Sequence, residues 1–136
     1  MDRLQALFSG SSAFALYFGA ALVLLVAFVG LYNLLTPYSE MALIREGNRS
    51  AALALGGAIV GFVIPVGKAI EQSSSLVDMI VWAAIAFVAQ VAAYGAGALL
   101  VPHFRRTIGE DHLASGILLA ALSVAIGILN AASMTS

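Results

Sequence analysis

The sequence contains no cysteine and few charged residues. Of its 136 residues, 10% are charged and 62% are hydrophobic. Without cysteine there is no disulfide, no thiolate metal site and no cysteine nucleophile. Soluble domains carry about 25% charged residues, and a chain this apolar could not cover its surface with polar groups. The composition therefore indicates an integral membrane protein.

Charge is absent from four long runs of the sequence. A helix that crosses about 30 Å of hydrocarbon needs about 20 residues. Each run satisfies this requirement: 4–39, 50–67, 79–104 and 113–136. We therefore predict an all-α bundle of four transmembrane helices forming one domain, residues 1–136. The expected helices cover about 11–35, 50–69, 76–101 and 112–132, with polar loops between them.

Only three prolines are present, and each has a position that matters for a helix. Pro37 and Pro102 are expected to end the first and third helices, because proline cannot continue the hydrogen-bond ladder. Pro65 falls inside the second helix and is expected to kink it. The first helix is too long for a signal-peptide core, so we expect it to be retained.

The two halves of the chain resemble each other. The segment LIREGNRSAAL can be placed over TIGEDHLASGI, so that Ile44 matches Ile108 and Glu46 matches Glu110, at an offset of about 65 residues. This match predicts a duplicated two-helix unit, with repeat 1 at about 11–70 and repeat 2 at about 76–134. Because each unit crosses the membrane twice, the two repeats should be parallel.

The distribution of Lys and Arg predicts the orientation. The loops that follow Pro37 and Pro102 carry four arginines, whereas Arg3 and Lys68 lie on the opposite side. The positive-inside rule therefore places these loops inside and both termini outside.

Small residues follow one face of each of the last three helices. Spacings of three and four put such residues in a line, and small side chains let membrane helices approach closely. The three lines are Ala54, Gly57, Gly61, Ile64 and Lys68; Ala83, Ala86, Gln90, Ala93 and Gly97; and Gly116, Ala120, Ser123, Gly127 and Asn130. We expect these faces to form the helix contacts.

Four polar residues near these faces have two possible roles: Lys68, Glu71, Gln90 and Asn130. Gln90 and Asn130 could form hydrogen bonds between helices, or they could line a polar path. Lys68 could reach the headgroups, with Glu71 one turn away, or it could face a pore mouth. Under both interpretations Gln90 should be buried between helices and away from lipid.

Other functional classes have little support in the sequence. A net charge of -1 gives no basic footprint for nucleic acid. His103 and His112 lack the spacing of metal ligands, and no nucleophile with a neighbouring base is recognisable. We therefore expect no enzyme activity, no metal and no cofactor.

Residues 36–65, TPYSEMALIREGNRSAALALGGAIVGFVIP, and residues 127–136, GILNAASMTS, resemble the YjfL-type family of small bacterial inner-membrane proteins. In that family a cysteine often precedes the final Met-Thr pair, where this chain has Ser133. The resemblance implies four helices from a duplicated unit in the bacterial inner membrane, with both termini periplasmic on the charge rule. It implies a setting in membrane maintenance, no established activity and no catalytic residues.

Two hypotheses for the function remain. The first is a homo-oligomeric membrane scaffold, most simply a dimer, that contacts the lipid bilayer and other membrane proteins and supports the envelope. The second is a small oligomeric channel or transporter-like protein for an ion or small solute, with Lys68, Glu71, Gln90 and Asn130 along its path. They differ in whether the polar faces enclose water or pack against one another.

Overall fold

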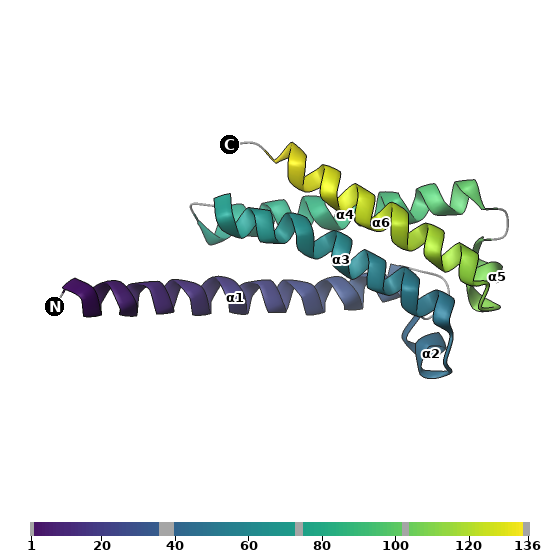
Figure 1. The fold of residues 1–136 in the computed structure, drawn as a ribbon, viewed down its shortest axis with the longest axis horizontal. Helices are drawn as coiled ribbons and strands as arrows, with labels where there is room; N and C mark the ends of the chain where they lie inside the picture. The colour runs from purple at the N-terminus through teal and green to yellow at the C-terminus, as the bar shows by residue number, and fades with distance from the viewer. Residues whose placement is uncertain (1, 36–39, 73–74, 102–103, 135–136) are drawn as a thin grey trace.

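The protein is a bundle of α-helices in the computed structural model, which describes residues 2–35, 40–72, 75–101 and 104–134 (Figure 1). The helices are α1 (Asp2–Leu35), α2 (Glu40–Arg45), α3 (Arg49–Gln72), α4 (Leu76–Leu100), α5 (Phe104–Gly109) and α6 (Leu113–Ser133). Within the described ranges, α1, α3, α4 and α6 are long and apolar enough to cross a membrane. The predicted all-α fold with four transmembrane helices is confirmed.

One predicted helix start is wrong. The first helix begins at Asp2 instead of near Ser11. The residues before Ser11 include good helix formers, and a lone glycine such as Gly10 costs a helix only about 1 kcal/mol. At the other end, α1 and α4 stop at Leu35 and Leu100. Pro37 and Pro102, which were expected to stop them, lie outside the described residues.

The expected polar loops are not loops throughout, because they contain α2 and α5. The C-terminal turn of α2 explains why this helix is so short. Asn48 N–H donates to the Leu43 carbonyl at 2.9 Å, and Gly47 N–H donates to the Ile44 carbonyl at 2.9 Å. Gly47 has a φ of 88°, the left-handed conformation in which glycine often ends a helix.

The C-terminal turn of α5 has the same hydrogen-bond pattern. His112 N–H donates to the Thr107 carbonyl at 2.8 Å, and Asp111 N–H donates to the Ile108 carbonyl at 3.0 Å. Asp111 takes the left-handed position, with a φ of 60°. The two turns agree in the register that places Ile44 on Ile108. This agreement supports the predicted duplication, which stays a prediction for the rest of the chain.

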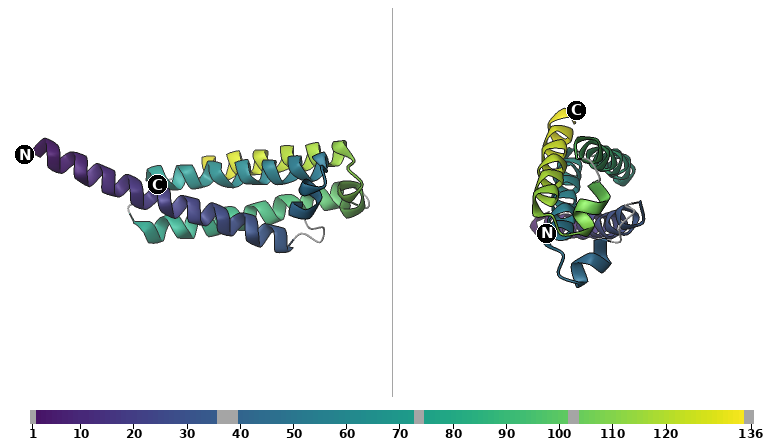
Figure 2. Two further views of the ribbon diagram at one scale, coloured as in Figure 1. Left: turned by 90° about the horizontal axis from the view of Figure 1, so that it is seen from below. Right: turned by 90° about the vertical axis from the view of Figure 1, so that its right-hand side faces the viewer.

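The centre of the bundle is the pair formed by α3 and α6, which run side by side in the same direction (Figures 1 and 2). The α4 helix packs in the opposite direction against both of them. Its buried residues are Met79, Ala83, Ala86, Gln90, Ala93 and Gly97. The last five are the line of residues that the sequence predicted for this helix.

The α1 helix lies beside the bundle and contacts α3 and α4. Phe28 and Tyr32 attach it, with 2% and 1% of their surfaces exposed. The Phe28 ring stacks on Phe62 of α3 at a centroid distance of 4.2 Å and meets the Phe87 ring of α4 edge-on at 5.9 Å. Stacked and edge-on aromatic pairs each contribute about 0.5–1.5 kcal/mol beyond the buried area. Aromatic contacts therefore hold α1, where small residues hold α3, α4 and α6.

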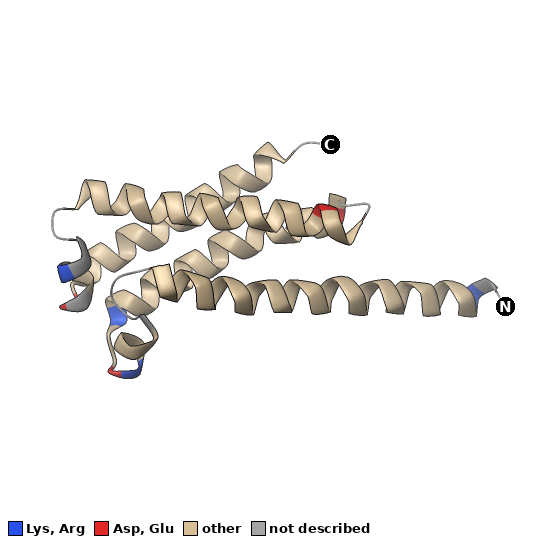
Figure 3. Cartoon of the chain, turned by 180° about the vertical axis from the view of Figure 1, so that it is seen from behind, with Lys and Arg blue, Asp and Glu red and all other residues tan. Residues whose placement is uncertain are grey.

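Charged residues lie at the ends of the bundle (Figure 3). The short helices α2 and α5 are at the end opposite both termini (Figure 1). Arg45, Arg49 and Arg106 lie at this end and are exposed. The apolar lengths of the four long helices lie between the two charged ends, as expected for helices that cross a bilayer.

Candidate functional site

The helices α3 and α6 approach each other closely at glycines on their facing sides. A Cβ atom built on Gly127 would lie 2.6 Å from the Cα of Gly61. One turn earlier on α3, a Cβ atom on Gly57 would lie 2.7 Å from the Cβ of Ala120. Real Cβ atoms do not approach other atoms this closely. Any side chain at these glycines would therefore separate the two helices.

Gln90 of α4 reaches this crossing from the third helix. Its side chain is fully buried, as the sequence predicted. Its Nε2 donates a hydrogen bond to the backbone carbonyl of Ser123 at 3.1 Å, and a Cβ on Gly61 would lie 2.6 Å from the same nitrogen. A side chain at position 61 would therefore displace the Gln90 amide from its present place.

This contact lies close to the middle of the membrane. Ser123 is halfway along α6, about 15 Å from each end of that helix at about 1.5 Å per residue. Gly61 lies near the midpoint of α3 in the same way. A hydrogen bond between membrane helices contributes about 0.6–2 kcal/mol. We call Gly61, Gln90, Ser123 and Gly127 the central contact.

Not every polar atom of the central contact is satisfied. Gln90 Oε1 and Ser123 Oγ are both buried, and neither has a hydrogen-bond partner among the described residues. An unsatisfied buried polar group costs about 1–3 kcal/mol. Two such atoms at mid-membrane are the feature of this site that helix packing alone does not explain.

The other predicted polar residues lie away from the central contact. Lys68 is half-buried and Glu71 is exposed, both in the last turns of α3. Lys68 is about 10 Å further along α3 than Gly61. Asn130 is half-buried, about 10 Å along α6 from Ser123, and its Nδ2 has no partner among the described residues. The four residues are thus spread along the axis of the bundle.

Pro65 is buried, and α3 continues through it from Arg49 to Gln72. The helix therefore tolerates the lost backbone donor without ending. The predicted kink at Pro65 stays a prediction. Of the glycines and alanines predicted for packing, all six are buried: Gly57, Gly61, Ala86, Gly97, Gly116 and Gly127.

A second polar cluster joins the two halves at the start of α3. Asn48 is 8% exposed. Its Oδ1 accepts from the N–H of Ala51 at 2.8 Å, which caps α3. Its Nδ2 donates to the carbonyl of Ile108 at 2.9 Å. A single side chain thus caps one helix and binds the turn before α6.

Ser50 connects the same two halves through two further hydrogen bonds. Its N–H donates to Asp111 Oδ1 at 2.8 Å, and its Oγ donates to the carbonyl of His112 at 2.9 Å. Asp111 Oδ2 also lies 3.8 Å from Arg49 Nε. Asp111, which precedes α6, therefore caps α3. His112, at the first position before α6, makes no side-chain cap.

Sequence reasoning shows only that residue types common at helix starts occur here: Asn48, Ser50, Asp111 and His112. It did not find that they cross-link the halves, because a capping residue normally serves its own helix. One signal in the sequence could have suggested the link. The turn that carries Asn48 and the turn that carries Asp111 are similar in sequence, and each ends in polar residues. We call Asn48, Ser50, Asp111 and the Ile108 and His112 carbonyls the cross-cap.

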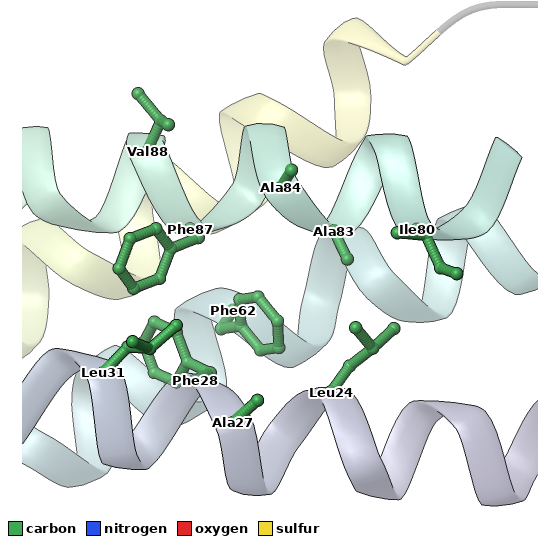
Figure 4. A pocket seen from close by; sticks show the side chains of 10 residues that line it. All are labelled: Leu24, Ala27, Phe28, Leu31, Phe62, Ile80, Ala83, Ala84, Phe87 and Val88. Atoms are coloured by element: carbon green, nitrogen blue, oxygen red, sulfur yellow. The ribbon is translucent and has the colours of Figure 1, made fainter. Parts of the chain in front are cut away.

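An apolar groove of about 300 Å³ lies between α1 and α4, with Phe62 of α3 at its floor (Figure 4). Its side chains are Leu24, Ala27, Phe28, Leu31, Phe62, Ile80, Ala83, Ala84, Phe87 and Val88. None of the polar residues predicted for a path lines this groove. It suits an apolar helix or acyl chain and offers nothing to replace the water around an ion.

In the described ranges, no three residues of the types His, Cys, Asp and Glu gather as metal ligands would. His112 Nε2 lies 3.7 Å from Glu110 Oε2, and both side chains are exposed. His103 lies outside the described residues. Glu110 and His112 belong to the charged end of the bundle. There, Arg106 Nε also donates a hydrogen bond to Glu110 Oε1 at 3.0 Å.

Comparisons with known proteins agree with this architecture. The chain is 33% identical to the UPF0719 inner membrane protein YjfL of Escherichia coli (strain K12) over 123 residues, which cover 90% of this chain and 93% of that protein. It is 32% identical to the UPF0719 transmembrane protein YshE of Bacillus subtilis (strain 168) over 122 residues, covering 88% and 91%. No solved structure matches the chain. The family model described as Domain of Unknown Function (DUF350) matches residues 5–134, so the chain belongs to this family of membrane proteins.

Proposed function

We propose that the protein is a non-catalytic, homo-oligomeric scaffold of a bacterial inner membrane that supports the cell envelope by binding other membrane helices. The observation that carries the proposal is the central contact. There, Gln90 binds the backbone of α6 at a crossing where glycines leave no space for a side chain. A polar residue used in this way stabilises helix packing.

The cellular location is part of this proposal. Relatives that align over about nine-tenths of the chain are named inner membrane and transmembrane proteins. The arginines at the α2 and α5 end favour that end on the cytoplasmic side, with both termini in the periplasm. The same arginines suit the anionic headgroups of the inner leaflet.

The surface proposed for self-assembly is α1. This helix is as apolar as the others, yet only 6% of its membrane-spanning window is buried, compared with 56% for α3. Val23 and Val26 are 69% and 73% exposed on it. A second copy that pairs its α1 with this face would cover the least buried helix of the bundle. Two copies satisfy this pairing, so we propose a dimer.

Cysteine cross-linking in membranes tests the dimer, because the chain has no cysteine of its own. In Val26→Cys, oxidation is expected to convert most of the protein to a covalent dimer. The matched control is Leu129→Cys on α6, which is similarly exposed at 65% and should stay monomeric. Equal cross-linking at both positions, or dimers only through Leu129→Cys, would contradict assembly through α1.

One observation favours the alternative of a channel or transporter-like protein. Gln90 Oε1 and Ser123 Oγ are buried at mid-membrane without partners among the described residues. Such atoms are commonly satisfied by water, and a file of water between subunits would need polar groups at this depth. In a scaffold, the two atoms would stay unpaired, and the rest of the contact between the helices would offset the cost of burying them.

Replacing Gln90 by methionine separates these two functions. Methionine has a similar length and is flexible and apolar, so it removes the bond to Ser123 together with the unpaired oxygen. If the protein is a scaffold, we expect the free energy of unfolding in detergent to change by about 1 kcal/mol or less. The dimer should form as in the unmodified protein. Vesicles holding either form should leak potassium and protons no faster than empty vesicles. Flux through the unmodified protein that Gln90→Met abolishes would establish the channel instead.

A further inference from the structure

The first part of α1 lies outside the buried core of the bundle. Every residue from Arg3 to Leu16 is exposed, and Tyr17 is the first that is half-buried. Tyr17 is also the first residue of α1 that packs against the main hydrophobic core. Figures 1 and 2 show this part of α1 projecting past the ends of α3, α4 and α6 on the side of both termini.

The length of α1 exceeds what the bilayer can hold. Its 34 residues extend about 51 Å, whereas the hydrocarbon core is about 30 Å thick. A tilt of about 40°, the upper end of the observed range, would still leave it about 9 Å too long. The part from Tyr17 to Leu35, which packs on the bundle, extends about 28 Å and is enough for one crossing. The turns before it therefore lie beyond the hydrocarbon.

Those first turns are amphipathic. At about 100° per residue, Leu4, Leu7 and Phe8 share one face, and Gln5 and Ser9 share the opposite face. The three apolar side chains are 57%, 63% and 73% exposed. A straight α1 would hold them in water, where each forgoes a large part of the stabilisation that burial of an apolar side chain supplies.

A bending point separates the amphipathic turns from the crossing part. Gly10, Ser11 and Ser12 are consecutive, and Gly and Ser pairs are among the few established causes of helix kinks. A Cβ on Gly10 would have no neighbour within 4 Å. No packing contact therefore holds α1 straight at this point.

We propose that in the membrane α1 bends at residues 10–12 and its first turns lie flat in the lipid interface, with Leu4, Leu7 and Phe8 inserted at the boundary between headgroups and acyl chains. The occupant of this apolar face is the lipid surface on the side of the termini. An amphipathic helix there buries its apolar face about 5–10 Å deep. This anchor fixes the rotation and tilt of α1 in the membrane, and it holds whether the bundle acts as a scaffold or as a channel.

Spin labels on single cysteines test the anchor in the full chain, reconstituted in vesicles of phosphatidylethanolamine and phosphatidylglycerol. Labels at Leu4→Cys, Leu7→Cys and Phe8→Cys should be accessible to oxygen and protected from a water-soluble nickel chelate. Labels at Gln5→Cys and Ser9→Cys should show the reverse. Midway along α4, Val88→Cys, at a position that is 65% exposed, should be accessible to oxygen only, which calibrates the lipid signal.

Three results would overturn the proposal. Nickel access at all five N-terminal positions would mean that the segment projects into water. Protection from both reagents at Leu7 and Phe8, with broadening from a nearby second label, would mean that another copy covers the face. A depth that increases steadily along the helix without alternation would mean a straight, tilted α1. Gly10→Ala with Ser11→Ala and Ser12→Ala should stiffen α1 and remove the alternation, while the signal of Val88→Cys is unchanged.

Discussion

Replacing Gly61 by leucine is expected to prevent the bundle from forming. A Cβ at this position meets the backbone carbonyl of Ser123 and lies 2.6 Å from Gln90 Nε2. Overpacking usually costs about 1–3 kcal/mol, and more where no rotamer relieves it. Here the obstacle is the backbone of α6, so the whole of α3 or α6 must shift. We expect a loss of about 3 kcal/mol or more, together with the Gln90 hydrogen bond.

The matched control is Gly56→Leu on the same helix. A Cβ on Gly56 has no neighbour within 4 Å, so the added side chain should face lipid. Unfolding by sodium dodecyl sulfate from mild detergent, followed through the fluorescence of Trp82, should give an unchanged or higher midpoint for Gly56→Leu. The variant Gly61→Leu should lack a cooperative transition. A normal transition in Gly61→Leu would mean that α3 and α6 do not cross at this glycine.

The sequence predicted the central contact well because membrane packing leaves a local pattern. Close approach requires small residues at every third or fourth position, and this pattern depends on one helix at a time. The positions of Gly57 and Gly61 in α3 and of Ala86 and Gln90 in α4 could therefore be predicted without knowing which helices meet. The pairing of α3 with α6 could not be predicted, because the small-residue faces of α3, α4 and α6 carry similar residues.

The short helices α2 and α5 and the cross-cap could not be predicted from the sequence, for a different physical reason. Helices of six residues are not stable alone, so α2 and α5 depend on tertiary contacts such as the burial of Ile108. The bond between Ser50 and Asp111 joins residues distant in sequence. The place of α1 was equally unpredictable, because its apolar residues surround the helix and no small-residue face points to a partner.

The second large effect is expected at Asn48, where alanine removes two buried hydrogen bonds. The N–H of Ala51 loses its cap, and the carbonyl of Ile108 loses one of its two donors, because Asp111 N–H still donates to it. Loss of a cap costs about 1 kcal/mol, and loss of one hydrogen bond costs about 0.5–1.5 kcal/mol. We expect Asn48→Ala to lower the free energy of unfolding by about 1.5–2.5 kcal/mol. The same detergent titration measures this loss.

Serine at position 48 separates the two contributions. Serine caps helices about as well as asparagine, but its shorter side chain should not reach Ile108. Stability should therefore fall in the order Asn48, Asn48→Ser, Asn48→Ala. The first step measures the link between the halves, and the second measures the cap. If Asn48→Ser matches the unmodified protein, the bond to Ile108 contributes nothing. The two halves would then be joined by the glycine crossing and by the bonds of Ser50 to Asp111 and His112, without a contribution from the Asn48 bond.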